Sequence, residues 1–230
     1  MLPGSKGAAA TANEFVFRVV FAVLWAVFIT NLSWVRYSAS RRKEERPADQ
    51  AARREWELHV TALAIFAPFW FGGIVLYIFI PDWIAFLSIP LPDWVRFIMA
   101  GMAAVSIPFT VWGYHTIGRN WVHAFEQSQF RQRTEDQLVT SGPYRYVRNP
   151  IYLGAFTMII ALAFLAANLL LLLPALFVVS LVYMQIDGEE AMLTERFGDE
   201  YREYAKRTPR IIPRFRRAAS AKQRSETGPA

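Results

Sequence analysis

The chain has 230 residues, and 54% of them are hydrophobic, including 18 Phe and 8 Trp. Its formal net charge is +6, but the basic residues flank apolar segments instead of forming one exposed stripe, which argues against a nucleic-acid partner. The absence of cysteine excludes disulfides, thiol nucleophiles and Cys-ligated metals. None of the histidines pairs with another at the i, i+4 spacing of a helical zinc site, so we expect no metal site.

Apolar segments of the length that an α-helix needs to cross a bilayer follow one another along the chain. Residues 1–13 are small and polar, and we expect them to be disordered. A three-helix membrane region follows at 14–112, with predicted spans at Phe15–Val35, Leu58–Ile80 and Val95–Trp112. The apolar run Ile151–Ile186 is too long for one span, so we expect a helical hairpin that breaks near Asn168. The predicted fold is therefore an all-α, polytopic membrane protein with about five transmembrane helices.

The distribution of Arg and Lys predicts which side of the membrane each loop faces. Residues 38–54 and 113–149 are rich in these residues, whereas the link at 81–94 and the hairpin turn contain none. Because cytoplasmic loops carry the excess of positive charge, we expect the N-terminus outside and the C-terminus in the cytoplasm. The short loops and the lack of cysteine favour a bacterial inner membrane.

The segment Leu138–Gly154, LVTSGPYRYVRNPIYLG, has the features of a ligand site. Gly142-Pro143 and Asn149-Pro150 are turn signals directly before a membrane helix, and backbone amides at such turns can receive polar groups of a ligand. Three tyrosines lie among these turns, and their aromatic faces suit a flat base or a sulfonium cation: Tyr144, Tyr146 and Tyr152. Taken singly, these Tyr and Arg residues could instead anchor the chain at the membrane interface.

A second segment, Gln185–Glu190 or QIDGEE, places acidic residues at the cytoplasmic end of the last predicted span. Acidic groups at the end of a membrane span indicate a functional site if they enter the membrane. The alternative is the charged start of a separate amphipathic surface helix beginning at Asp187. A basic tail at 214–230 follows, and we expect it to be disordered.

The order of these motifs resembles the isoprenylcysteine carboxyl methyltransferase family and its phospholipid N-methyltransferase relatives. The resemblance rests on LVTSGPYRYVRNPIYLG, the apolar hairpin and EEAMLTERFGDEYREYAKRTPRIIP, with GRNW at Gly118–Trp121 upstream. The resemblance covers residues 113–213. It implies that these residues form a methyltransferase core around a cytoplasmic cofactor cup. It also implies methyl transfer from S-adenosyl-L-methionine to a small lipophilic acceptor that arrives from the membrane lipid.

The resemblance implies roles for particular residues. Those at the positions of the family's cofactor contacts, or beside them, are Gln129, Asp136, Gln137, Leu138, Val139, Tyr144, Asn149, Pro150, Ile151, Tyr152, Glu189 and Glu190. Glu189 is expected to pair with the amino group of the cofactor, and Gln185 and Arg148 to face the substrate. Glu190 and His115 are the candidate bases for an amine or hydroxyl acceptor.

Three positions depart from the family pattern. Asp136 stands where the family often has His, Asn149 replaces the His of Arg-His-Pro, and Gln185 replaces an Arg that faces the substrate carboxylate in eukaryotic members. A neutral amide cannot supply that ion pair, which disfavours carboxyl methylation of a prenylated cysteine.

Two other functions stay open. One is a sterol-reductase-like enzyme that binds NADPH, which the adjacent acids would disfavour by repelling phosphates. The other is a non-catalytic membrane protein with the same scaffold.

Overall fold

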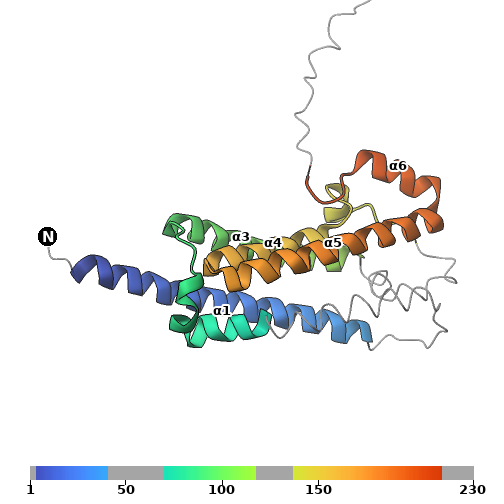
Figure 1. Cartoon of the computed structure of the whole chain (residues 1–230). Helices are drawn as coiled ribbons and strands as arrows, with labels where there is room; N and C mark the ends of the chain where they lie inside the picture. Colours follow the sequence, from blue (N-terminus) through green and yellow to red (C-terminus); the bar gives the residue numbers. More distant parts are fainter. Residues whose placement is uncertain (1–3, 41–69, 118–136, 214–230) are drawn as a thin grey trace, which may run out of the picture.

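The computed structural model describes residues 4–40, 70–117 and 137–213, and these residues are helical apart from short connections (Figure 1). The elements in chain order are α1 (Gly4–Ser40), the helix Trp70–Phe79, the 3-10 helix η1 (Pro81–Leu87), α3 (Asp93–Ile117), η4 (Gly142–Arg145), α4 (Pro150–Ala166), α5 (Leu169–Phe197) and α6 (Asp199–Arg207). The predicted all-α class is confirmed.

Several of these helices are long and apolar enough to cross a membrane. Ala12–Asn31 within α1, the whole of α3 and the whole of α5 meet that criterion, and Trp70–Phe79 with η1 would make a fourth span, bent by 114°. Helix α4 has 17 residues, or about 25 Å at 1.5 Å per residue, which is the lower limit for a span. Each of the five predicted spans thus lies on a helix, although the structure describes the second only from Trp70 on. The chain is an integral membrane protein.

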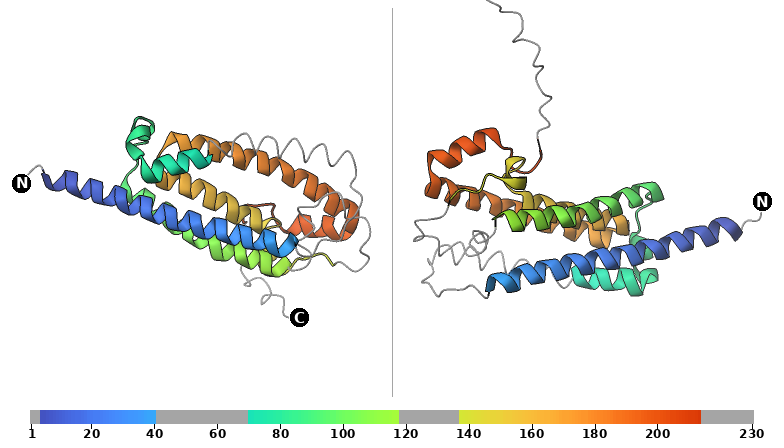
Figure 2. Two further views of the ribbon diagram at one scale, coloured as in Figure 1. Left: turned by 90° about the horizontal axis from the view of Figure 1, so that it is seen from below. Right: turned by 180° about the vertical axis from the view of Figure 1, so that it is seen from behind.

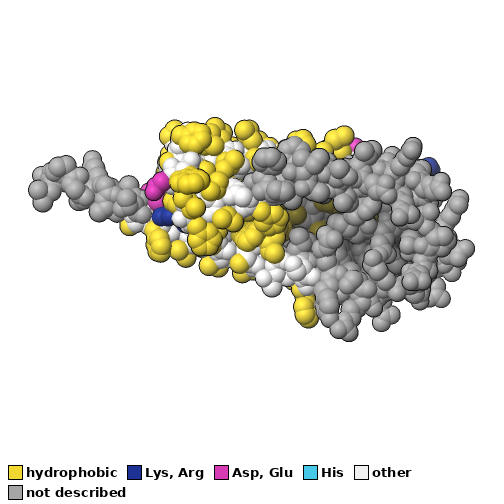
Figure 3. All heavy atoms as spheres, turned by 60° about the horizontal axis from the view of Figure 1, so that its bottom comes forward, with side chains coloured by type: hydrophobic (Ala, Val, Ile, Leu, Met, Phe, Trp, Pro, Cys, Tyr) yellow, Lys and Arg dark blue, Asp and Glu magenta, His cyan; other side chains and the backbone are white. Residues whose placement is uncertain are grey.

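Helices α3, α4 and α5 lie side by side, and α1 runs along them in all the views (Figures 1 and 2). The N-terminus and the turn between α4 and α5 lie toward one end of the bundle, and α6 folds back at the other end. Large apolar side chains cover the outer surface, among them Phe79, Phe86 and Val105, which are 74%, 81% and 69% exposed. On the face shown in Figure 3, charged side chains of the described residues appear only toward the two ends. Such a surface suits hydrocarbon, not water.

Three element boundaries differ from the predictions. Helix α1 begins at Gly4 and so takes in most of the stretch expected to be disordered, where Ala8–Ala10 favour helix. Helix α3 continues to Ile117, past the predicted loop start at 113. Helix α5 passes Asp187 without a break and ends at Phe197, because the helix formers that follow Glu190 continue its hydrogen bonding. The predicted start of a surface helix at Asp187 is therefore wrong, and the acidic pair lies inside α5.

The predicted break of the hairpin is confirmed at Asn168. Ala167 takes a left-handed conformation with φ of 49°, and the Asn168 side chain caps α5 by accepting a hydrogen bond from the Leu170 N–H at 2.9 Å. The Asn168 amide also donates to the Ile84 carbonyl at 2.9 Å, and the Ile89 N–H donates to the Ala167 carbonyl at 2.7 Å. One residue thus caps the second arm and ties the turn to η1.

Close contact between α3 and α4 sets the position of the opposite end. A Cβ on Gly154 of α4 would lie 2.0 Å from Thr110 Oγ1 of α3, so only glycine allows this approach. Beyond α3, Gly142 has φ of 57°, and a Cβ there would lie 2.6 Å from Thr116 Oγ1. These two glycines place η4 and the start of α4 directly against the last turns of α3.

At the other end, a buried arginine joins four helices. Arg96 of α3 is 3% exposed, and its Nε donates to the Leu165 carbonyl of α4 at 2.9 Å. Its guanidinium pairs with Glu14 of α1, lies 3.9 Å from the centre of the Phe17 ring and contacts the Tyr77 hydroxyl. Because a buried charge is tolerated when it is paired and hydrogen-bonded, this cluster fixes α1 to the rest of the bundle.

Candidate cofactor site

Four segments meet near the end of the bundle that carries α6: η4, the start of α4, the last turns of α5, and α6 with the residues after it (Figure 1). The Arg148 N–H donates to the Pro209 carbonyl at 2.8 Å, and the Asn149 N–H donates to the Arg210 carbonyl at 3.0 Å. The chain after α6 is thereby fastened along the turn that precedes Pro150.

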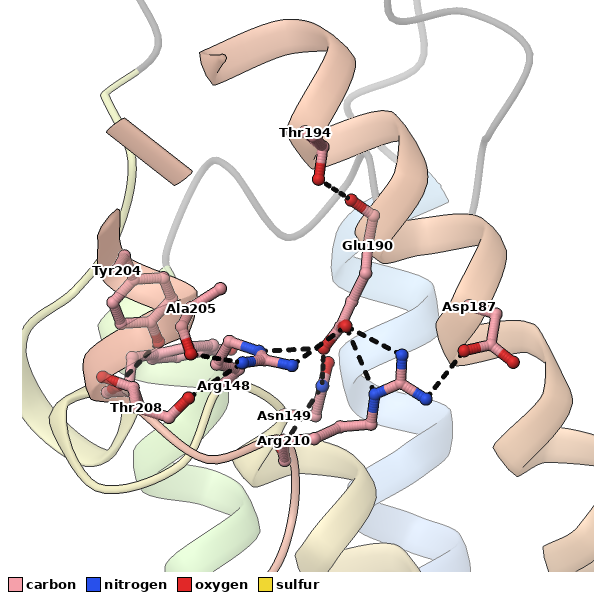
Figure 4. Close-up of polar contacts among 10 residues, drawn as sticks. Arg148, Asn149, Asp187, Glu190, Thr194, Tyr204, Ala205, Thr208 and Arg210 are labelled. Carbon is pink, nitrogen blue, oxygen red and sulfur yellow. Dashed lines mark hydrogen bonds and ion pairs between the residues drawn. The ribbon is translucent and has the colours of Figure 1, made fainter. Parts of the chain in front are cut away.

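The Glu190 carboxylate is the centre of a polar network that joins these segments (Figure 4). Its Oε1 accepts from Arg148 Nε at 3.0 Å and from Asn149 Nδ2 at 3.2 Å. Its Oε2 accepts from Arg148 Nη2 at 3.0 Å and from Arg210 Nη2 at 2.8 Å. Two guanidinium groups thus hold one carboxylate, a geometry in which each bond is charge-assisted.

Arg148 uses its remaining donors to hold α6. Its Nη1 donates to the Ala205 carbonyl at 2.8 Å and to the Thr208 carbonyl at 2.9 Å (Figure 4). Arg210 pairs in addition with Asp187 at 2.7 Å, and its hydrogen bond to Glu190 raises the pKa of Arg210 above its usual range. The network is therefore a structural clamp between α4, α5 and the C-terminal segment.

Glu189, the adjacent residue, has a different environment. The Tyr152 hydroxyl of α4 donates a hydrogen bond to its carboxylate, and no Arg, Lys or His of the described ranges pairs with it. The side chain is half-buried, and the Tyr152 ring lies 6.0 Å from the ring of Phe156. Glu189 is thus a carboxylate beside aromatic rings, with a neutral hydroxyl as its partner.

The predicted tyrosines separate into two groups. Tyr144 is buried, and burial raises the pKa of Tyr144 above its usual range, so the phenol stays neutral. The Tyr144 carbonyl accepts from the Tyr204 hydroxyl at 2.6 Å, which ties η4 to α6. Tyr146 is 53% exposed and stacks with Arg145, at 5.2 Å from the guanidinium carbon to the ring centre. Tyr144 and Tyr152 therefore lie in the interior of the site, whereas Tyr146 lies at its surface.

The structure places the remaining predicted residues as follows. Gln129, Asp136 and the GRNW motif lie outside the described residues. Pro150 is buried as the first residue of α4, and Ile151 is half-buried against Gly113. Leu138 and Val139 are half-buried ahead of η4, and Gln137 is exposed. Gln185 lies one turn before Glu189 on α5, and His115 is exposed in the last turn of α3.

Sequence reasoning did not anticipate the part played by the segment after Gly198. Arg210 lies twenty residues after Glu190 in the chain, so the periodicity of a single helix or strand does not predict that the two side chains meet. Tyr201 and Tyr204 lie three residues apart on α6, and both are buried, so one face of this helix packs against the rest of the protein. The RTPRIIP letters within the motif were the one available signal that this segment belongs to the site.

Comparison with known proteins confirms the resemblance inferred from the motifs. Residues 95–200 match the sequence model of the phospholipid methyltransferase family, a range that runs from α3 into α6 and contains both acidic residues.

Curated relatives share the same part of the chain. Protein-S-isoprenylcysteine O-methyltransferase of Schizosaccharomyces pombe is 39% identical over 84 residues, 36% of this chain and 36% of that protein. The nickel-cobalt-cadmium resistance protein NccN of Alcaligenes xylosoxydans xylosoxydans is 31% identical over 100 residues, 44% and 45% of the two chains. Methanethiol S-methyltransferase 1 of Bradyrhizobium diazoefficiens is 31% identical over 105 residues, 46% and 34% of the two chains. The chain thus spans less than half the length of each of these relatives.

Proposed function

We propose that the protein is a methyltransferase that uses S-adenosyl-L-methionine to methylate a small lipophilic acceptor. The observation that carries this proposal is the contrast between two adjacent carboxylates. Glu190 is neutralised by two arginines, whereas Glu189 has a neutral tyrosine as its partner in the described part of the chain. A half-buried carboxylate favours a cationic ligand, because an opposite charge offsets its loss of hydration.

The donor set fits that cofactor in chemical terms. Glu189 would hold the ammonium group, and the faces of Tyr144 and Tyr152 would lie against the adenine or the sulfonium. The predicted contacts from Gln129, Asp136, Gln137, Leu138, Val139, Asn149, Pro150 and Ile151 would surround the adenosine. When bound, the cofactor supplies an electrophilic methyl group and leaves as S-adenosylhomocysteine.

The contribution of this chain to the reaction is alignment and exclusion of water. Holding the acceptor in line with the methyl group and the leaving sulfur can lower the barrier by roughly 7–11 kcal/mol when the geometry is good. The apolar outer surface lets a lipophilic acceptor approach from the bilayer. In this proposal Gln185 faces the acceptor. An amine, thiol or hydroxyl acceptor releases a proton to a base, whereas a carboxylate acceptor does not need one.

We assign a positioning role to Glu190 instead of the predicted role as a base. Its oxygens are occupied by Arg148, Asn149 and Arg210, so accepting a proton would break the clamp. Arg148, predicted to face the substrate, is likewise engaged within the protein. His115 remains the candidate base.

We place the site at the cytoplasmic face of a bacterial inner membrane, with the N-terminus outside. The support is the Arg-rich composition of the loops on that side in the sequence. The position of α6 at the end of the bundle opposite the N-terminus agrees with an odd number of crossings (Figure 1).

The test is calorimetric titration of the purified protein in detergent with S-adenosylhomocysteine. Saturable binding that is lost in Glu189→Ala, but kept in the control Glu203→Ala on the exposed face of α6, would support the cofactor assignment. The absence of binding by folded wild-type protein would overturn it. A parallel titration with NADPH tests the reductase alternative, and transfer of a labelled methyl group to lipid extracts distinguishes an enzyme from a non-catalytic scaffold.

A further inference from the structure

The Tyr201 side chain on α6 has an unusual environment for a buried phenol. It is 3% exposed, and within the described ranges its hydroxyl is the one buried side-chain oxygen or nitrogen without a hydrogen-bond partner. Buried hydroxyls are nearly always hydrogen-bonded, because an unpaired one keeps the full cost of its lost hydration. Phenylalanine would fill the same space without that cost.

Tyr201 lies on the face of α6 that covers the site. Tyr204 and Ala205 follow it by three and four residues, so all three project from one side of the helix. The Ala205 carbonyl accepts from Arg148, the Tyr204 hydroxyl donates to the Tyr144 carbonyl, and the rings of Tyr201 and Tyr204 are 6.0 Å apart.

The charges around Tyr201 belong to the site as well. Burial and then the negative charge of Glu190 raise the pKa of Tyr201 to about 12, so the phenol keeps its proton and can donate it in a hydrogen bond. Arg148, Arg210 and Glu189 also act on it electrostatically. The two guanidinium groups are engaged by Glu190 and Asp187, so among the described residues the Tyr201 hydroxyl is the buried donor at this corner that has no acceptor.

We propose that the Tyr201 hydroxyl binds the carboxylate of the cofactor's amino-acid end, by donating a hydrogen bond to it. This inference rests on the proposed function, and it adds the anion-binding half of the same site. The ammonium and carboxylate groups of an amino acid are bonded to one carbon, so they need a carboxylate and a donor close together. Glu189 at the end of α5 and Tyr201 on the α6 helix that folds back over it supply that pair.

The experiment compares Tyr201→Phe with wild-type protein, using S-adenosylhomocysteine and 5′-methylthioadenosine, which lacks the amino-acid end. We expect Tyr201→Phe to weaken S-adenosylhomocysteine binding about tenfold, as for loss of a hydrogen bond to a charged group, and to leave 5′-methylthioadenosine binding unchanged. The melting temperature of the ligand-free variant should stay equal or rise, because an unpaired buried hydroxyl is removed. In the matched variant Tyr204→Phe it should fall, because that hydroxyl has a partner.

Other results would overturn the inference. Unchanged affinity of Tyr201→Phe for S-adenosylhomocysteine, or an equal loss for both ligands together with a lower melting temperature, would assign Tyr201 a purely structural role. If wild-type protein binds S-adenosylhomocysteine, either result leaves the proposed function intact. If folded wild-type protein binds neither ligand, the proposed function fails and this inference fails with it.

Discussion

Arg148 and Glu190, 42 residues apart in the chain, form a two-pronged ion pair in which Nε reaches Oε1 and Nη2 reaches Oε2, each at 3.0 Å. Arg148 lies just before α4 and Glu190 lies in the last turns of α5, so the pair closes the open end of the helical hairpin. Asn168 closes the other end through the turn. Glu189 lies next to Glu190 on α5, so the position of Glu189 depends on this closure.

Glu190→Ala should destabilise the protein by about 3 kcal/mol, because it leaves two largely buried guanidinium groups without their carboxylate. Thermal unfolding in detergent measures the loss. Glu203→Ala is the matched control, since Glu203 makes an exposed pair with Lys206 on α6. Equal melting temperatures for Glu190→Ala and the control would contradict the clamp.

Arg148→Lys should be nearly as damaging as Arg148→Ala, with a loss of about 2 kcal/mol. A lysine ammonium can neutralise Glu190, but it cannot hold both carboxylate oxygens and the Ala205 and Thr208 carbonyls in one plane. Unfolding of the two variants and wild type by denaturant provides the comparison. Wild-type stability in Arg148→Lys would show that charge alone is sufficient.

Gly154→Ala should destabilise the α3–α4 contact by about 1–3 kcal/mol, because its Cβ would lie 2.0 Å from Thr110 Oγ1. The second substitution Thr110→Ala, which removes that oxygen, should restore part of the loss. Gly101→Ala is the control, since a Cβ there meets nothing within 4 Å. The melting temperatures of the three variants test the contact, and a tolerated Gly154→Ala with intact folding would refute it.

Asn168→Ala should lower stability by about 1–2 kcal/mol through loss of the cap on α5. Asn168→Asp keeps the acceptor for the Leu170 N–H but loses the donor to the Ile84 carbonyl, so it should be intermediate. The order wild type, Asp, Ala in melting temperature is the expected outcome. An Asp variant as unstable as the Ala variant would assign the effect to η1 instead of the cap.

Tyr152→Phe should weaken S-adenosylhomocysteine binding several-fold, which is less than the complete loss expected for Glu189→Ala. The substitution removes the hydroxyl that orients Glu189 but keeps the ring beside the site and the charge itself. Calorimetric titration of both variants gives the order. A Tyr152→Phe protein that binds as weakly as Glu189→Ala would mean that the hydroxyl contacts the ligand directly.

Much of the fold could be predicted because a bilayer imposes simple rules on sequence. The lengths of the apolar runs predicted the helices, and the one strongly polar residue in the middle of the longest run, Asn168, predicted the turn. The paired motifs around Pro150 and Glu189 resemble those of a methyltransferase family, and the comparison confirmed this resemblance over residues 95–200. These are properties of local composition and spacing, which the chain carries without reference to its folded form.

The tertiary structure decided what the sequence left open at the site. Glu189 and Glu190 are chemically identical neighbours, and their separate roles arise because successive residues of a helix point about 100° apart. One of them therefore meets Arg148 and Arg210, and the other meets Tyr152. The sequence by itself determined which apolar segments are helical and where charge is excluded, since both follow from hydrophobicity and periodicity. The packing of α4, α5 and α6 alone determined which charges are paired, because those pairings join residues that no local period relates.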